Sequence, residues 1–186
     1  MRLLLTGLVC ALSGLALQPL SAQANTGCGC DVSKPETLAA RECGLTREAE
    51  KHPPEVATFI LKDINPRKPN RWLALPRSYQ KNQYLLSDMS SDERLKLWET
   101  AIAKGKEMFG DRWALAMNGV RVRTQCHVHV HIGRLIEGLE TERFIVVDGP
   151  EQIPVPTDGT GLWVYPKDGK LVVHLGEQLT ETVLLR

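Results

Sequence analysis

The stretch Cys126-His127-Val128-His129-Val130-His131-Ile132-Gly133 is the most informative part of this sequence, because three of the protein's five histidines alternate there with apolar residues. Side chains two positions apart on a β-strand lie on the same face, about 6.6 Å from each other. The pattern therefore predicts a strand over residues 126–135 with the three histidines on one face and the aliphatic residues in the core. Imidazole rings are poor core residues, so the pattern indicates a functional site.

The segments on either side of this stretch predict further strands and one long helix. Ser90 and Glu93 form a capping box, and Gly110 stops the helix, which predicts a helix over 91–109. Asp168-Gly169 is a hairpin turn signal between two apolar segments. Strands are predicted over residues 56–61, 71–75, 113–117, 162–165 and 170–175.

These elements predict an α+β domain with a mainly antiparallel sheet, one long helix and a small N-terminal helical cap over residues 25–55. The region between Gly138 and the last hairpin is acidic and rich in turn residues, and no strand is predicted there. A length of 186 residues with 42% apolar residues is typical of one globular domain and excludes disordered, collagen-like and coiled-coil chains.

Residues 1–24 have the composition of a secretory signal peptide. Arg2 precedes a short apolar run, and small residues follow it up to Ala24, after which cleavage is expected. The run is shorter than the roughly 20 residues that span a bilayer comfortably. The protein is therefore predicted to be exported, periplasmic or secreted, and membrane-anchored if this segment is not cleaved.

Four cysteines remain after such cleavage, and an oxidising compartment favours their pairing as disulfides. The spacing of Cys28, Cys30 and Cys43 predicts that one of the first two pairs with Cys43. The partner of Cys126 stays open, because four cysteines allow three pairings. A Cys-x-Cys…Cys metal site is the alternative.

Charge is unevenly distributed along the cleaved chain, although its net charge is zero. Residues 25–61 carry −2, residues 62–134 carry +7, and residues 135–186 carry −5. The basic segment contains the three histidines and favours an anionic ligand such as a phosphate ester, with a solvated hairpin tip as the alternative. Overall neutrality gives no reason to expect nucleic acid as a partner.

Two kinds of chemistry suit three alternating histidines. A His-x-His pair can bind one zinc or copper ion, which would make the protein a periplasmic metal-binding module. Neutral imidazole is also a good nucleophile at phosphorus near neutral pH. Nearby arginines, and the lack of clustered Asp, Glu or Cys ligands in this part of the sequence, favour phosphoryl chemistry without a metal or other cofactor.

Residues 56–135 resemble the histidine triad superfamily, in which three histidines alternate with apolar residues. The lead-in Asn118-Gly-x-x-x-Arg123-Thr124-Gln125 is most similar to that of the CDP-diacylglycerol pyrophosphatase family. The resemblance implies a HIT-like fold for residues 56–186, with the C-terminal hairpin as an extension of the catalytic domain.

The resemblance also implies a two-step displacement in which His129 attacks the α-phosphorus of a nucleotide and water then releases the nucleoside monophosphate. It implies that His131 bonds a phosphate oxygen and that His127 orients the site and assists the leaving group. Arg71 stands where common triad hydrolases have a histidine, and it either contacts a phosphate or is a surface charge. The implied substrate-binding residues are Asn118, Arg123, Thr124, Gln125 and Arg71.

The expected enzyme is a CDP-diacylglycerol diphosphatase that forms CMP and phosphatidate, with a nucleotide or liponucleotide as substrate and contact with a membrane surface through the lipid. Hydrolysis of soluble dinucleotides or phosphoramidates is the alternative within the same superfamily. A homodimer is the assembly that common triad enzymes suggest.

Overall fold

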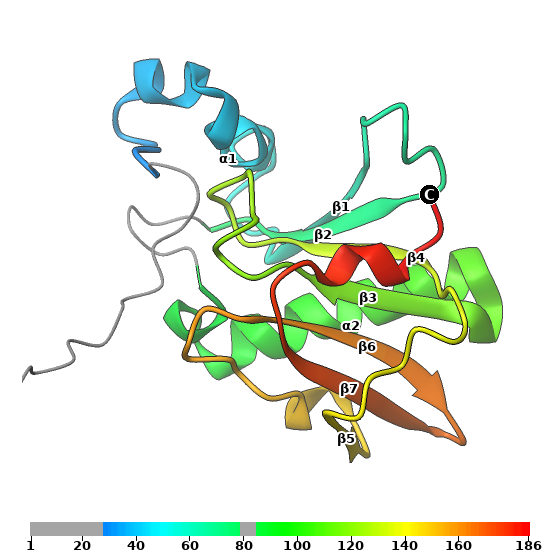
Figure 1. Ribbon diagram of the computed structural model, residues 1–186. Helices are drawn as coiled ribbons and strands as arrows, with labels where there is room; N and C mark the ends of the chain where they lie inside the picture. Colours follow the sequence, from blue (N-terminus) through cyan, green and yellow to red (C-terminus); the bar gives the residue numbers. More distant parts are fainter. Residues whose placement is uncertain (1–27, 79–84) are drawn as a thin grey trace, which may run out of the picture.

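The computed structural model describes residues 28–78 and 85–186, whose elements are shown in Figure 1. The predicted signal peptide, residues 1–24, lies outside the described residues. Within them, an antiparallel sheet of seven strands has the order β1-β2-β4-β3-β6-β7-β5. Its strands are β1 (Thr58–Lys62), β2 (Trp72–Pro76), β3 (Trp113–Met117), β4 (Val130–Arg134), β5 (Phe144–Val147), β6 (Gly161–Lys167) and β7 (Lys170–Glu177).

The long helix α2 (Ser91–Phe109) begins and ends as the sequence predicts. The Glu93 backbone N–H donates to Ser90 Oγ at 3.3 Å, and the Ser90 N–H donates to Glu93 Oε2 at 2.8 Å. The helix approaches β3 closely at Gly105, where an added Cβ would lie 3.1 Å from Trp113 Cβ. The predicted α+β class with an antiparallel sheet and one long helix is therefore confirmed.

The C-terminal half of the sheet contains one strand that the sequence did not predict. Strands β6 and β7 are joined by the predicted Asp168-Gly169 turn, where both residues have positive φ, as a tight hairpin turn requires. Strand β5 pairs with the outer side of β7 and forms the sheet edge. Its first three residues are exposed, which is why it lacks the alternating pattern of a half-buried strand.

The two faces of the sheet have different coverings. Helix α2 packs on one face against Val130 and Ile132 of β4, and Figure 1 shows it behind the strands. His131 lies between Val130 and Ile132 on β4, and neighbouring side chains of a strand point to opposite faces. The His131 side chain therefore lies on the other face of the sheet, together with its register partners Leu73 and Ala116. The 3₁₀ turn η6 (Thr180–Val183), drawn in red, lies over that second face.

The N-terminal cap consists of short helical segments, as predicted. These are the 3₁₀ turns η1 (Pro35–Ala39) and η2 (Arg41–Cys43) and the helix α1 (Gly44–Ala49). Short 3₁₀ turns elsewhere are η3 (Leu86–Asp88), η4 (Gly110–Arg112) and η5 (Pro150–Gln152). In the described part of the chain, no helix is both long and apolar enough to cross a membrane.

Two disulfides connect the cap internally and to the rest of the molecule. Cys30 pairs with Cys43, in agreement with the predicted short loop, and Cys28 pairs with Cys126, a pairing that the sequence left open. The second bond attaches the cap to the residue immediately before the first histidine of the motif. Disulfides persist mainly in oxidising compartments, which agrees with the predicted exported environment.

Candidate active site

The histidine motif is only partly a strand. Strand β4 begins at Val130, so His127 and His129 lie in the segment before it, whereas the alternating pattern predicted one strand over residues 126–135. This segment is tied to the N-terminal cap through Cys126. The Cys126 N–H donates to the Glu42 carbonyl at 2.9 Å, and the Cys126 side chain is in a disulfide. The prediction of three histidines on one face of one strand was therefore wrong.

His127 lies behind the other two histidines. Its side chain is fully buried, and its Nε2 is 2.7 Å from the Pro76 carbonyl oxygen at the end of β2. A carbonyl oxygen can only accept, so Nε2 of His127 carries a proton. This contact holds the His127 ring against the strand and leaves its backbone carbonyl to interact with the next histidine of the motif.

The contacts of His129 determine which of its ring nitrogens can act as a nucleophile. Its Nδ1 is 2.8 Å from the His127 carbonyl oxygen, which makes Nδ1 the protonated nitrogen. In a neutral imidazole the other nitrogen, Nε2, then carries the lone pair. His129 also lines a cavity, so its free lone pair belongs to a ring that a ligand can reach.

His131 is the only one of the three that lies on β4 itself. Its ring is edge-on to that of His129, with 4.9 Å between the ring centroids. It also lines the cavity, and its Nδ1 is 3.7 Å from Oε2 of Glu181. The fold thus brings His129 and His131 to the cavity wall and keeps His127 behind them.

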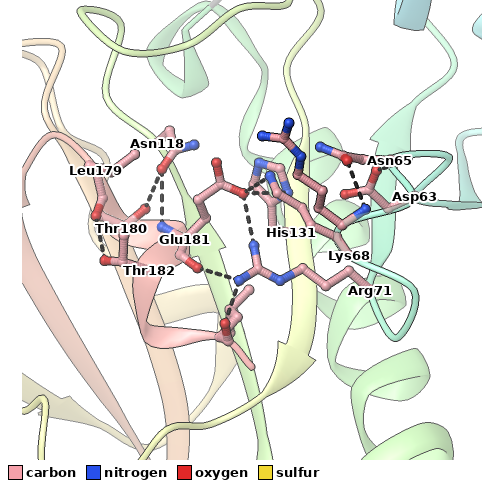
Figure 2. Close-up of polar contacts among 12 residues, drawn as sticks. Asp63, Asn65, Lys68, Arg71, Asn118, His131, Leu179, Thr180, Glu181 and Thr182 are labelled. Carbon is pink, nitrogen blue, oxygen red and sulfur yellow. Dashed lines mark hydrogen bonds and ion pairs between the residues drawn. The ribbon is translucent and has the colours of Figure 1, made fainter. Parts of the chain in front are cut away.

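Glu181 is a component of the site that the sequence did not predict. Figure 2 shows its carboxylate between Asn118 on one side and His131, Lys68 and Arg71 on the other. Oε2 accepts from Arg71 Nη1 at 2.8 Å and from Lys68 Nζ. Glu181 lies 50 positions after His131 in η6, in a segment with no motif, so only the tertiary structure reveals it.

Burial lowers the pKa of all three motif histidines. It lowers the pKa of His127 to about 4 and that of His131 to about 4, against an ordinary value of 6.5. Burial also lowers the pKa of His129 well below 6.5, and the neighbouring His131 adds to this effect. Desolvation penalises the charged form, so all three rings are neutral at pH 7, and a neutral His129 ring can act as a nucleophile.

Acid is therefore expected to destabilise the fold before the carboxylates titrate. Between pH 6.5 and 4 the unfolded histidines bind protons that the folded ones exclude, so stability falls as the pH falls below 6.5. Each such histidine raises the unfolding constant by up to about tenfold per pH unit. Denaturant midpoints at pH 7, 6 and 5 measure this, and His131→Asn should flatten the dependence. Equal midpoints across this range would contradict the buried neutral histidines.

The cavity has a volume of ≈ 640 Å³, which is in the range of small-molecule sites. The N-terminal cap, the loop between β1 and β2, the segment before β4 and η6 all contribute to its wall. Its polar and charged lining residues are Arg41, Arg47, Glu48, Lys62, Asp63, Asn65, Lys68, Asn118, Arg123, Thr124, Gln125, His129, His131 and Glu181. Apolar lining comes from Leu45, Leu61, Ile64, Leu73 and Val122.

Three of the expected substrate-binding residues have positions that suit this role. Arg123 is buried and lines the cavity, and its positive charge lowers the pKa of His127 and His129. Thr124 lies exposed at the cavity wall. Asn118 lines it too, and its Oδ1 accepts from the Glu181 N–H at 3.1 Å, which connects the end of β3 to η6.

Gln125 lines the cavity, but both ends of its amide hold the N-terminal cap. Oε1 accepts from the Leu45 N–H at 3.0 Å, and Nε2 donates to the Arg41 carbonyl at 2.9 Å. These bonds, together with the Cys28–Cys126 disulfide, fix the cap beside the histidines. The structure therefore gives Gln125 a structural task that the sequence did not indicate.

Arg71 differs from both expectations for it. Its side chain is 2% exposed, so it is not a surface charge. Its guanidinium donates to the Glu181 carboxylate and to the backbone carbonyls of Glu181, Leu184 and Leu185. It is not among the described residues that line the cavity. Its position just before β2 serves to attach the C-terminal segment to the sheet, and a phosphate contact has no support.

Metal binding was the alternative use of the histidines. Among the described residues, no group of three or more His, Cys, Asp or Glu side chains is arranged so that it could hold a metal ion. His127 uses its Nε2 and His129 its Nδ1 for backbone carbonyls. The arrangement that the residues do form is a neutral imidazole at a cavity with cations on both sides.

Comparisons with known proteins do not add a family assignment. No protein-family model matches the chain, and no significant match is found among curated proteins.

Proposed function

We propose that this protein is an exported hydrolase of the histidine triad type that cleaves the pyrophosphate of a nucleotide, with CDP-diacylglycerol as its substrate. The observation that carries the proposal is the hydrogen bond between His129 Nδ1 and the His127 carbonyl, which leaves a neutral Nε2 as nucleophile in a ring that lines a cavity. An antiparallel sheet with one long helix on the opposite face is compatible with a HIT-like arrangement.

In the first step, His129 Nε2 forms a bond to the α-phosphorus, and the bond from that phosphorus to the oxygen of phosphatidate breaks. Phosphatidate leaves, and a nucleotidyl-histidine remains. In the second step, water attacks the same phosphorus, the nitrogen–phosphorus bond breaks, and CMP leaves while a proton passes to solvent. His127 supports both steps as a positioning residue, since its burial keeps it away from the leaving group.

Cations on both sides of the histidines support an anionic substrate. The positive charge of Arg123 lowers the pKa of His127 and His129, and the positive charge of Lys68 lowers the pKa of His131. Both residues line the cavity. Fixed positive charges next to a transferring phosphoryl group stabilise the negative charge that develops on its oxygens. Asn118 and Thr124 are further groups that can bind the substrate.

Apolar residues in the cavity wall favour a lipid over a fully soluble substrate. Leu45, Leu61 and Leu73 line it, and Ile64, in the loop between β1 and β2, lines it while being 92% exposed. An aliphatic side chain so exposed at the edge of a cavity suits contact with acyl chains or a membrane surface. This feature distinguishes CDP-diacylglycerol from dinucleotides and phosphoramidates as the proposed substrate.

The test compares substrates for the full-length protein in detergent micelles. CMP release from CDP-diacylglycerol is expected to exceed release of nucleoside monophosphate from a dinucleoside polyphosphate or a nucleoside phosphoramidate. Acid quenching during turnover should trap a CMP adduct on the peptide that contains His129. Cleavage of the soluble compounds alone would overturn the lipid substrate, and cleavage of none of the compounds would overturn the proposed function.

A further inference from the structure

The contact between Glu181 and His131 joins a carboxylate to a buried ring nitrogen. The distance from Oε2 to Nδ1 is 3.7 Å, and Nδ1 is fully buried without a hydrogen bond within the described residues. The Glu181 side chain is 18% exposed, and both residues line the cavity. An ionised carboxylate this close to a buried ring nitrogen acts strongly on the proton distribution of the ring.

The position of the Glu181 carboxylate is determined by three separate interactions. Arg71 and Lys68 both donate to Oε2, and the Glu181 backbone N–H donates to Asn118 Oδ1. Arg71 also donates to the Glu181 carbonyl at 2.8 Å, so that both the side chain and the backbone of this residue are held. Burial raises the pKa of Glu181, but its interactions with His131, Lys68 and Arg71 outweigh burial and leave that pKa below its ordinary value, so the carboxylate is charged at neutral pH.

A carboxylate beside Nδ1 selects one tautomer of a neutral histidine. A proton on Nδ1 lies next to the negative charge, whereas the other tautomer places a lone pair there. We propose that Glu181 is a positioning residue for His131, whose carboxylate holds the ring proton on Nδ1 and stabilises the imidazolium that forms when a phosphate group binds at Nε2. The inference deepens the proposed function and rests on it for its kinetic consequence.

The protonation step involves one proton and no covalent change. When the phosphate group binds, His131 Nε2 takes a proton from solvent and donates it in a hydrogen bond to a non-bridging phosphate oxygen. The imidazolium Nδ1–H then interacts with Glu181 across the contact already present. The proton returns to solvent when the product leaves. Such a charged donor stabilises the oxygen charge that grows during phosphoryl transfer.

Charges of both signs face His131 when no ligand is bound. Glu181 and Asp63 raise its pKa, Lys68 and Arg71 lower it, and the His129 ring lies 4.9 Å away. Two carboxylates thus oppose two cations, while burial keeps the ring neutral. An incoming phosphate group adds negative charge on the cavity side and shifts this balance toward the imidazolium. Loss of the Glu181 charge shifts it the opposite way.

The first measurement uses the unaltered protein and nitrogen NMR of labelled histidine side chains at pH 7. His131 is expected to be the Nδ1–H tautomer in the free protein and to gain the signature of an imidazolium in the presence of CMP. An Nε2–H tautomer in the free protein would overturn the inference. A neutral His131 in the CMP complex would overturn it as well. Neither result requires a variant to fold.

The second measurement compares Glu181→Gln with Glu177→Gln. Glu177 is also a carboxylate that raises the pKa of a buried histidine, but its partner is His174 on β7. Removing the Glu181 charge should lower the pKa of His131 further, keep the ring neutral with CMP bound, and reduce kcat/KM by about 10²-fold. Glu177→Gln should lower the pKa of His174 alone and preserve kcat/KM. Glu181→Asp, which keeps the charge, should recover part of the activity.

The two proposals fail in different ways. If the protein cleaves no nucleotide, the proposed function is wrong, and the tautomer of His131 in the free protein still decides the role of Glu181. If the protein cleaves CDP-diacylglycerol but His131 has the same tautomer, the same pKa and the same response to CMP in Glu181→Gln, then the role of Glu181 is wrong and the proposed function stands.

Discussion

Replacing His129 with alanine is expected to reduce CMP release from CDP-diacylglycerol by roughly 10⁴-fold or more, because the reaction loses its nucleophile. The ring nitrogen that would attack phosphorus exists as a free lone pair only because Nδ1 is bound to the His127 carbonyl. The measurement is kcat under saturating substrate, together with loss of the trapped CMP adduct. The fold should persist, since a neutral side chain at the cavity wall is removed.

The matched control for this substitution is His52→Ala. His52 is a histidine outside the cavity whose ring stacks on Phe59 at 4.0 Å between centroids. Its removal should leave kcat within about twofold, since its ring lies outside the cavity and only a small packing contact is lost. Undiminished turnover by His129→Ala would rule out the nucleophile assignment, and an equal loss in both variants would indicate a general effect on folding.

The largest effect on stability is expected from removing the Cys28–Cys126 disulfide. The bond joins residues 98 positions apart, and closing a loop of that length restricts the unfolded chain by roughly 4 to 5 kcal/mol in the chain-entropy model. For a domain of this size, the double substitution Cys28→Ala with Cys126→Ala should lower Tm by roughly 10 to 20 °C. Thermal unfolding at neutral pH, followed by circular dichroism, measures the change.

Removing the Cys30–Cys43 disulfide provides the matched comparison. Its residues are only 13 positions apart, so the expected loss is smaller, about 3 kcal/mol. The longer bond should also matter more for kcat, because Cys126 directly precedes the His127 backbone that orients His129. A larger Tm decrease from the short bond, or unchanged kcat after loss of the long one, would contradict this account.

The parts of the fold that the sequence predicted depend on local signals. Helix α2 has a capping box and a glycine stop within its own ends, and the turn between β6 and β7 needs only Asp168-Gly169. Strand β5 was missed because its apolar residues pair at an exposed sheet edge inside an acidic segment, where no alternation marks a buried face. The Cys30–Cys43 pairing was also a short-range inference.

The candidate site was predictable to the same extent. The three histidines form a local pattern, but the burial that keeps their rings neutral was not predicted from the sequence. Their separation into one supporting ring and two cavity rings was not predictable. This separation depends on two bonds from Cys126 to the N-terminal cap, the disulfide to Cys28 and the hydrogen bond from its N–H to the Glu42 carbonyl.

The sequence by itself determined which imidazoles form the candidate site, because the three histidines follow one local pattern, and the nearby arginines favoured phosphoryl chemistry over metal binding. Only the tertiary structure decided the surroundings of that motif. It placed Glu181 beside His131, turned Arg71 away from the cavity, and used Gln125 to hold the cap. The physical reason is that these roles depend on contacts between residues about 50 to 110 positions apart, and no local pattern encodes such contacts.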